Sequence, residues 1–210
     1  MLFQNLDMSP ESLEKFNKLN EIAEPYDALL FDVDGTLANN ISAHKAAYVA
    51  TAAEYNIILD DALIDETAGW PTVAVAKEIC IRYHTTFDVQ EFSTRKSAIF
   101  IERYIQETQP IDYVVEHLKF QIGKKRIAAV SGGSRSTLTI TLTVLGVLDK
   151  LETLVCAGDT PLGKPSPQPF ILAAERLQIE AAKCLVYEDG IPGVQGAIAA
   201  GMGAVRIDQI

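Results

Sequence analysis

Cysteine is scarce in this 210-residue sequence, which contains only 3. So small and odd a number excludes the disulfide framework of a small secreted domain. We expect Cys80, Cys156 and Cys184, which lie in apolar runs, to be buried thiols. Long apolar runs are also missing, since none approaches the roughly 20 residues that cross a bilayer. Residues 1–24 are too acidic and too polar for a secretory signal. The sequence therefore predicts a cytoplasmic protein with no membrane partner.

Basic residues are the second shortage: 18 Lys and Arg stand against 28 Asp and Glu, for a net charge of −10. Because nucleic acids are bound by clustered Lys and Arg, this balance disfavours a nucleic-acid partner. It leaves room for a small anionic substrate, provided that a cation and a few basic residues meet at one site. The sequence contains no internal repeat and no low-complexity tract. Its length suits one large domain, or a domain with an insert.

Short apolar runs that alternate with helical segments indicate an α/β fold. The runs predicted as strands are residues 28–31, 127–130, 154–156, 184–187 and 204–207. Helical patterns cover residues 113–122, 169–177 and 194–200, and a first helix is expected from Ser9-Pro10 to just before Pro25. Such alternation favours a doubly wound parallel sheet with helices on both faces.

Two segments need separate interpretation. Residues 42–108 carry only helical signals, so we predict an all-helical insert over 41–108 and a core made of 1–40 and 109–210. Residues 137–144 alternate strictly between Thr and apolar residues, which locally favours a strand. Leu138, Leu142 and Leu145 also fit one helix face, and a helix keeps the β–α–β crossover intact. We therefore predict a helix there.

Polar motifs follow four of the predicted strands, at the sheet edge where open α/β folds bind ligands. The first, Asp-Val-Asp-Gly-Thr-Leu, occupies residues 32–37. The Asp32 carboxylate could attack phosphorus, and Asp34 could protonate the leaving oxygen and then activate water. Gly35 permits a tight exit from the strand. An Asp-rich turn is the structural alternative for Asp-Gly alone.

The other three motifs are weaker individually. Ser131-Gly132-Gly133-Ser134 offers a hydroxyl and free N–H groups at a helix start, which suits an anion. Lys164 offers a positive charge to a phosphate. Glu188 and Asp189 offer the hard oxygen ligands that Mg²⁺ prefers, or an acidic helix start that pairs with the macrodipole. The Ser131–Ser134 motif and the segment around Lys164 are also typical of ordinary loops.

Together and in this order, the motifs closely resemble the haloacid-dehalogenase superfamily over residues 28–207. The helical insert resembles the small helical cap of the β-phosphoglucomutase-like branch. The loop Gly69-Trp70-Pro71-Thr72 is similar to the substrate-facing cap loop of sugar-phosphate phosphatases in that branch. The resemblance implies a Rossmann-like core whose strands, numbered along the chain, follow the spatial order five, four, one, two, three.

The resemblance also implies the role of each matching residue. Asp32 corresponds to the nucleophile and a magnesium ligand, and Asp34 to the general acid/base, whose backbone carbonyl also binds the metal. Asp189 corresponds to a side-chain metal ligand. Glu188 corresponds to a residue that binds the metal directly or through another ligand. Lys164 corresponds to the basic residue that holds the nucleophile and the phosphoryl oxygens.

Substrate contacts are implied for a second set, which comprises Ser131, Gly132, Gly69, Trp70, Thr72 and His44. Ser131 and the Gly132 N–H correspond to the phosphate cradle. His44 matches a hinge histidine that couples cap closure to the acid/base, with an ordinary helix histidine as the alternative.

Departures from the family are limited. Asn39 stands where the family often has Asp, and Gly190 where it has Ser or Ala. Neither position has a catalytic role. Asp34 argues against the dehalogenases and phosphonatases, which lack a carboxylate there. Thr72 stands where sugar mutases carry Arg, and Lys77 is the only nearby replacement that the sequence suggests.

The expected function is a magnesium-dependent phosphatase that hydrolyses a small phosphate monoester, such as a sugar phosphate, through an aspartyl phosphate. A β-phosphoglucomutase-type mutase is the enzymic alternative, and a non-catalytic metabolite-binding module the non-enzymic one. The sequence names neither the substrate nor the oligomeric state, and it is compatible with a monomer.

Overall fold

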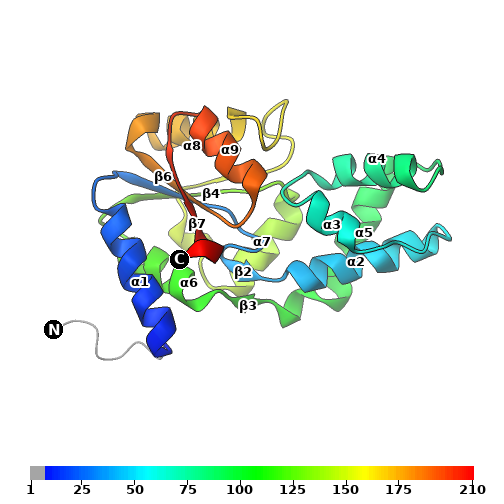
Figure 1. The fold of residues 1–210 in the computed structure, drawn as a ribbon, viewed down its shortest axis with the longest axis horizontal. Helices are drawn as coiled ribbons and strands as arrows, with labels where there is room; N and C mark the ends of the chain where they lie inside the picture. The colour runs from blue at the N-terminus through cyan, green and yellow to red at the C-terminus, as the bar shows by residue number, and fades with distance from the viewer. Residues whose placement is uncertain (1–7) are drawn as a thin grey trace.

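A computed structural model describes residues 8–210 (Figure 1). The expectation that residues 1–24 are not a secretory signal also covers residues 1–7, which lie outside the described residues. Its centre is a five-stranded sheet in the order β5–β4–β1–β6–β7, with every neighbouring pair parallel. The strands are β1 (Ala28–Phe31), β4 (Arg126–Val130), β5 (Thr153–Val155), β6 (Cys184–Glu188) and β7 (Gly203–Arg206). When these five strands are numbered along the chain and the sheet is followed from β7, the order is five, four, one, two, three, which confirms the prediction.

Helices cover both faces of this sheet, because alternate residues of each strand point to opposite sides. Leu29 and Phe31 belong to the core cluster on one face, which is covered by α1 (Pro10–Ala23), α6 (Asp112–Gln121) and α7 (Arg135–Val144). Ala28 and Leu30 belong to the opposite cluster, which is covered by α8 (Gln168–Leu177) and α9 (Ile191–Ala199). The doubly wound architecture is confirmed.

The ambiguous segment 137–144 lies within helix α7, as predicted. Leu138 and Leu142 are fully buried against the sheet. Two of the threonines bond back to the helix: Thr139 donates to the carbonyl of Arg135 at 2.8 Å and Thr143 to that of Thr139 at 2.7 Å. Burial of one leucine stripe thus outweighs the strand preference of the alternating pattern.

A separate group of helices lies beyond one end of the sheet (Figure 1). This helical lobe consists of α2 (Ile41–Glu54), α3 (Ala62–Glu66), α4 (Thr72–Arg82) and α5 (Val89–Arg103). It has its own apolar cluster, which includes Ile79 and Phe92. The segment is helical, as predicted, but it is joined to the rest by a short antiparallel pair, β2 (Ala38–Asn39) and β3 (Gln109–Pro110), that the sequence patterns did not reveal.

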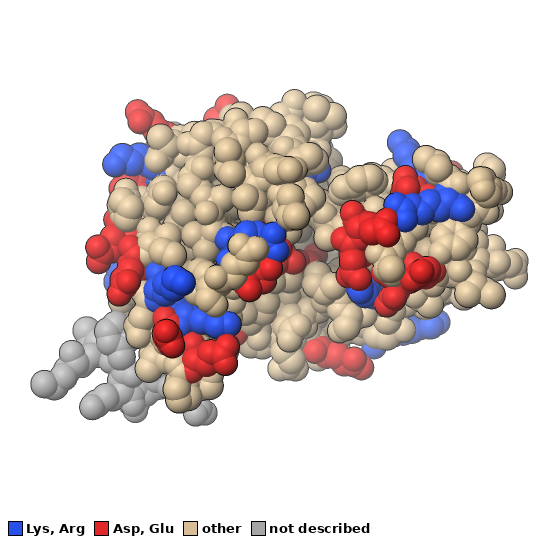
Figure 2. Space-filling view, viewed as in Figure 1, with Lys and Arg blue, Asp and Glu red and all other residues tan. Residues whose placement is uncertain are grey.

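Single-turn 3₁₀ helices complete the described elements, at Ile105–Glu107, Leu148–Lys150, Ala181–Lys183 and Ile207–Gln209. Within residues 8–210, no helix combines the length and apolarity that crossing a bilayer requires. Basic and acidic side chains are interspersed on the face that Figure 2 shows, where an indentation separates the lobe from the sheet-containing part.

The expectation of three buried cysteines is wrong for one of them. Cys156 and Cys184 are buried free thiols, whereas Cys80 is only partly buried. Cys80 lies in α4 one position beyond the inward-facing stripe of Val75, Ala76 and Ile79, so the helix turns it towards the surface.

A buried polar network fixes the first helix behind the sheet. His117 of α6 is fully buried; one ring nitrogen lies 2.9 Å from the Asn20 side-chain oxygen of α1, and the other lies 2.8 Å from the Tyr187 hydroxyl of β6. Burial lowers the pKa of His117 to about 3, so the ring is neutral and one nitrogen donates while the other accepts. The network braces β6 just before Glu188.

Candidate active site

The four sequence motifs meet at the carboxyl edge of the sheet. Asp32 follows β1, Ser131 follows β4, Lys164 lies in the loop between β5 and α8, and Glu188 ends β6. Most of them line a cavity of about 240 Å³ between this edge and the helical lobe. Parallel strands bring their carboxyl ends to one edge, so residues more than 100 positions apart become neighbours.

Lys164 is the buried cation of this site, with only 5% of its surface exposed. Its ammonium group lies 2.6 Å from Asp32 Oδ1 and also contacts Glu188 Oε1. Burial alone would lower the pKa of Lys164, but the charges of Asp32 and Glu188 outweigh it and hold the pKa above its ordinary value. Lys164 therefore remains protonated and ties two strand ends together.

Three carboxylates lie together at this site, and two of them contact Lys164. One oxygen from each of Asp32, Glu188 and Asp189 lies within 4.8 Å of the others. Burial and the charges of Glu188 and Asp189 raise the pKa of Asp32 well above its usual range, and burial with the charge of Glu188 raises that of Asp189 to about 6. This excess of negative charge and hard oxygen donors fits a Mg²⁺ ion, which takes few carboxylates and fills its other positions with water or phosphate.

Two glycines make this crowding possible. A Cβ on Gly35 would lie 2.2 Å from an Asp189 carboxylate oxygen, and the backbone φ of +92° is itself unfavourable for other residues. A Cβ on Gly193 would lie 1.9 Å from the Glu188 carboxyl carbon. Both positions are thus restricted to glycine by the approach of the acidic groups.

The Ser131–Ser134 segment forms a loop ahead of α7. The buried Ser131 hydroxyl accepts a hydrogen bond from the Gly133 N–H at 3.1 Å, and Ser134 caps the helix. A Cβ on Gly132 would lie 3.0 Å from the Gly69 carbonyl oxygen of the lobe. The loop therefore has the hydroxyl and N–H groups of an anion site and is covered by the lobe.

Asp34 is held by groups that reach it from the start of the lobe. Asn40 donates to its Oδ1 at 2.7 Å, and the His44 Nε2 lies 3.1 Å from the same oxygen. Burial would raise the pKa of Asp34, but the interactions with His44, the Asn40 hydrogen bond and the charge of Lys96 together lower it to about 2. Asp34 is therefore ionised, the state required of a general base.

Lys96 is a site residue that the sequence analysis missed. Its side chain is buried within the cavity lining, 2.5 Å from His44 Nδ1 and 4.5 Å from the centre of the Tyr48 ring. Burial lowers its pKa to about 8, partly offset by Asp34. A signal was present: Phe92, Lys96 and Phe100 recur every four residues, which places a lysine on an apolar helix stripe.

The predicted lobe residues divide into two groups. His44, Gly69, Trp70 and Thr72 all line the cavity. Lys77, in contrast, is exposed on α4 and is not among the lining residues. Lys77 therefore does not reach the cavity, because α4 turns it outwards, and the buried lysine in the lining is Lys96 of α5.

Comparison with known proteins places the chain in a family. A family profile described as haloacid dehalogenase-like hydrolase matches residues 26–201. The chain belongs to the haloacid dehalogenase-like hydrolases. The resemblance inferred from the motifs is thus confirmed, and α1 lies outside the matched range.

Relatives of this hydrolase carry names that refer to two reactions. It is 27% identical over 184 residues to fructose-1-phosphate phosphatase YqaB of Escherichia coli (strain K12), an alignment that covers 88% of this chain and 97% of the relative. It is 25% identical over 189 residues to β-phosphoglucomutase of Bacillus subtilis (strain 168), covering 87% and 83%. The crystal structure of β-phosphoglucomutase from Clostridium difficile has the same fold, with a TM-score of 0.76 at 21% identity over 85% of this chain and 83% of that one.

Magnesium should stabilise this hydrolase, because a cation that binds only the folded state relieves the repulsion among the three carboxylates. In chelator, Asp189→Asn should unfold at a higher temperature than the wild type, since it removes one crowded charge. With millimolar magnesium the order should reverse, because the variant binds the metal at least roughly tenfold more weakly. Differential scanning calorimetry measures both. Asp149→Asn, which alters an exposed carboxylate paired with Lys150, is the matched control; an equal magnesium shift in all three proteins would contradict the site.

Proposed function

We propose that this protein is a magnesium-dependent phosphatase that hydrolyses a small phosphate monoester, a sugar phosphate or a similar metabolite. The proposal rests on one observation: Asp32, Asp34 and the Ser131 loop line one cavity, and Lys164 contacts Asp32 beside it. A nucleophile, an acid/base, a fixed cation and an anion cradle are the parts that phosphoryl transfer needs. The Escherichia coli relative, named for fructose 1-phosphate, supports a sugar phosphate as the substrate.

The reaction divides into two steps at Asp32. Its carboxylate attacks phosphorus, the phosphorus–oxygen bond to the leaving group breaks, and the leaving oxygen takes a proton from Asp34, which must first acquire one. Asp34, ionised again, then accepts a proton from water as the water attacks the aspartyl phosphate. Phosphate departs and Asp32 is restored. The two carboxylates thus carry the nucleophilic and the proton-transfer roles separately.

The remaining groups hold the charge in place. Lys164 keeps Asp32 oriented and offsets phosphoryl charge, and Ser131 with the Gly132 N–H binds the other phosphoryl oxygens. Asp32, Asp189, Glu188 and the Asp34 carbonyl would hold magnesium, which would supply positive charge to offset that of the phosphate. Glu188 also contacts Lys164, so it links the basic and acidic parts of the site.

We further propose that residues 41–108 act as a cap over a core formed by 1–40 and 109–210. Two contacts support this division: the Gly69 carbonyl lies against Gly132, and a Cβ on Gly163 would lie 3.0 Å from the Pro71 ring. The loop 69–72 thus covers the phosphate loop and the Lys164 loop together. Closure of such a cap excludes water from the reacting groups and lets Trp70 and Thr72 contact the leaving group.

A phosphomutase is the second candidate, and Lys96 is the observation that favours it. A mutase must hold a second phosphate beneath the cap, and Lys96 is a buried cation in that part of the cavity. Against this, Lys96 is engaged by His44, and Thr72 occupies the place of the forked arginine that suits a phosphate. A non-catalytic binding module has less support, because the nucleophile, acid/base, lysine and acidic residues are all present.

The function is tested by a screen of sugar, nucleotide and short-chain phosphates with magnesium. We expect inorganic phosphate to appear in step with substrate loss, and Asp32→Asn to abolish turnover because no other group can accept the phosphoryl group. Conversion of β-glucose 1-phosphate to glucose 6-phosphate, primed by the bisphosphate and with little free phosphate, would instead establish the mutase.

Lys96 should impose an alkaline limit on catalysis. Its pKa is lowered to about 8, so it is charged below that pH and loses its charge as the pH rises through it. Because that positive charge lies in the cavity lining and attracts an anionic phosphate substrate, kcat/KM of the wild type should fall with a midpoint near this value. Lys96→Met should be less active throughout and lack this decline, whereas Lys77→Met, which alters an exposed lysine, should retain it. The same decline in Lys96→Met would refute the role.

A further inference from the structure

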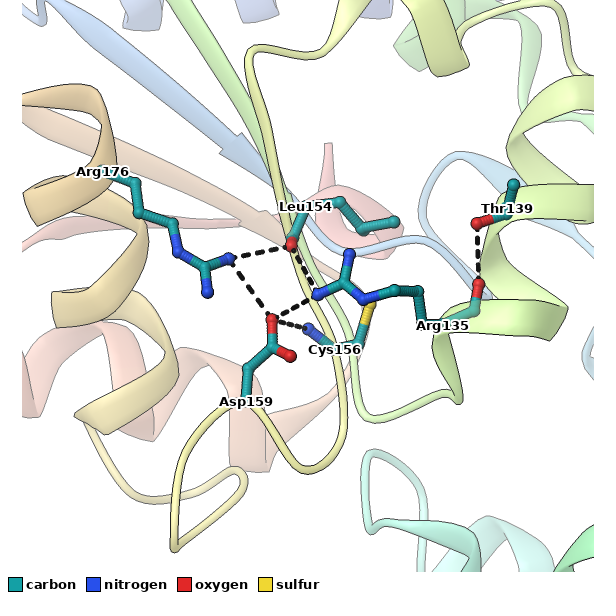
Figure 3. Close-up of polar contacts among 6 residues, drawn as sticks. All are labelled: Arg135, Thr139, Leu154, Cys156, Asp159 and Arg176. Atoms are coloured by element: carbon teal, nitrogen blue, oxygen red, sulfur yellow. Dashed lines mark hydrogen bonds and ion pairs between the residues drawn. The ribbon is translucent and has the colours of Figure 1, made fainter.

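A second cluster of charged side chains lies outside the cavity, where β5 ends (Figure 3). One carboxylate oxygen, Asp159 Oδ2, accepts hydrogen bonds from Arg135 at 2.6 Å, from Arg176 at 3.3 Å and from the Cys156 N–H at 3.3 Å. Both guanidinium groups also reach the Leu154 carbonyl, at 3.4 Å for Arg135 and 3.1 Å for Arg176. We call Arg135, Asp159 and Arg176 the clamp.

The three members of the clamp come from different elements. Arg135 is the first residue of α7, directly after the Ser131–Ser134 loop. Asp159 lies in the loop that leaves β5 and leads to Lys164, and Arg176 lies near the end of α8, beyond Lys164. The clamp therefore connects the helix that follows the phosphate loop to the segment that carries the catalytic lysine.

Backbone hydrogen bonds reinforce one side of this connection. The Ala157 N–H donates to the Gly133 carbonyl at 3.0 Å, and the Ser131 N–H donates to the Val155 carbonyl at 3.0 Å. The start of the Lys164 loop is thus in direct contact with the phosphate loop. Arg135, which directly follows the phosphate loop, adds a side-chain contact to Asp159 of the Lys164 loop. The Arg176 side chain, by contrast, bonds to Leu154 and Asp159 from a helix that does not follow the phosphate loop.

The exposure of the clamp argues against stability as its main role. The side chains of Arg135 and Arg176 are 54% and 38% exposed, and ion pairs this accessible to water add little to folding. Their geometry is nonetheless specific, because two planar forks converge on one carboxylate oxygen and one carbonyl of an edge strand. Such an arrangement determines where the connected loops lie.

We propose that Arg135 and Asp159 are positioning residues that hold the phosphate loop and the Lys164 loop at a fixed separation, so that both engage one phosphate. This inference rests on the proposed function, since it assigns the clamp to the same phosphate site. Arg135 acts on the phosphate loop through α7, and Asp159 anchors it to the other loop. Arg176 secures Asp159 from the far side.

The two arginines provide a matched comparison, because each binds the same carboxylate from a different helix. Arg135→Met should raise KM and the inhibition constant for inorganic phosphate by about five- to tenfold, the size expected for coupled neighbours, with kcat within about twofold. Arg176→Met should change either constant by less than about twofold. Asp159→Asn should resemble Arg135→Met, and Asp159→Glu should restore most of the affinity. Arg126→Met, which breaks an exposed pair with Glu152 at the other end of the sheet, is the outer control.

Direct calorimetric titration with inorganic phosphate and magnesium separates this inference from the proposed function. Weaker phosphate binding in Arg135→Met and Asp159→Asn but not in Arg176→Met, at similar unfolding midpoints, supports the clamp, even if no tested ester is hydrolysed. Weaker phosphate binding together with no hydrolysis of any tested ester would overturn only the phosphatase proposal. Equal effects of Arg135→Met and Arg176→Met on phosphate binding, or no effect of either in an active enzyme, would overturn the clamp.

Discussion

Charge balance around Lys164 is the constraint on which the rest of the site depends. One buried ammonium group contacts Asp32 and Glu188, and Asp189 adds a third carboxylate nearby. A single cation cannot neutralise three acids, so the site has an excess of negative charge that a divalent cation would offset. The surrounding fold accommodates this crowding: β1 and β6 are adjacent strands, and Gly35 and Gly193 leave room for the acidic side chains.

The pKa of Asp34, the second carboxylate, is lowered by residues in and next to the helical lobe. Asp34 belongs to the sheet edge, but Asn40 and His44, which contact it, lie at the start of the helical lobe, and Lys96 approaches from α5. The pKa of Asp34 thus depends on residues of the lobe. Asp32, in contrast, is held by residues of the sheet-containing part alone. Both carboxylates therefore lie on the sheet-containing part, but His44 and Lys96, which lower the pKa of Asp34, lie in the part proposed to move.

Much of this organisation was predictable from local patterns. Buried strands such as 28–31 and 184–188 read as continuous apolar runs, and the acidic motifs stand directly after them. Lys96 and Asn40 were not predictable in the same way, because their roles depend on how α2 and α5 pack, and Lys77 was favoured only by its nearness in sequence to Thr72. The pair β2–β3 was also missed, since two-residue strands leave no periodic signal. Cys80 shows the same limit: its apolar neighbours do not reveal which way the helix turns it.

The central claim is that Asp32 itself accepts the phosphoryl group, and chemical trapping tests it most directly. Enzyme quenched during turnover and treated with borohydride should contain homoserine at position 32, because borohydride reduces an acyl phosphate to an alcohol. Peptide mass spectrometry should find this conversion only when substrate and magnesium are both present. Unmodified Asp32 in an enzyme that is turning over, or conversion at Asp34 instead, would contradict the account.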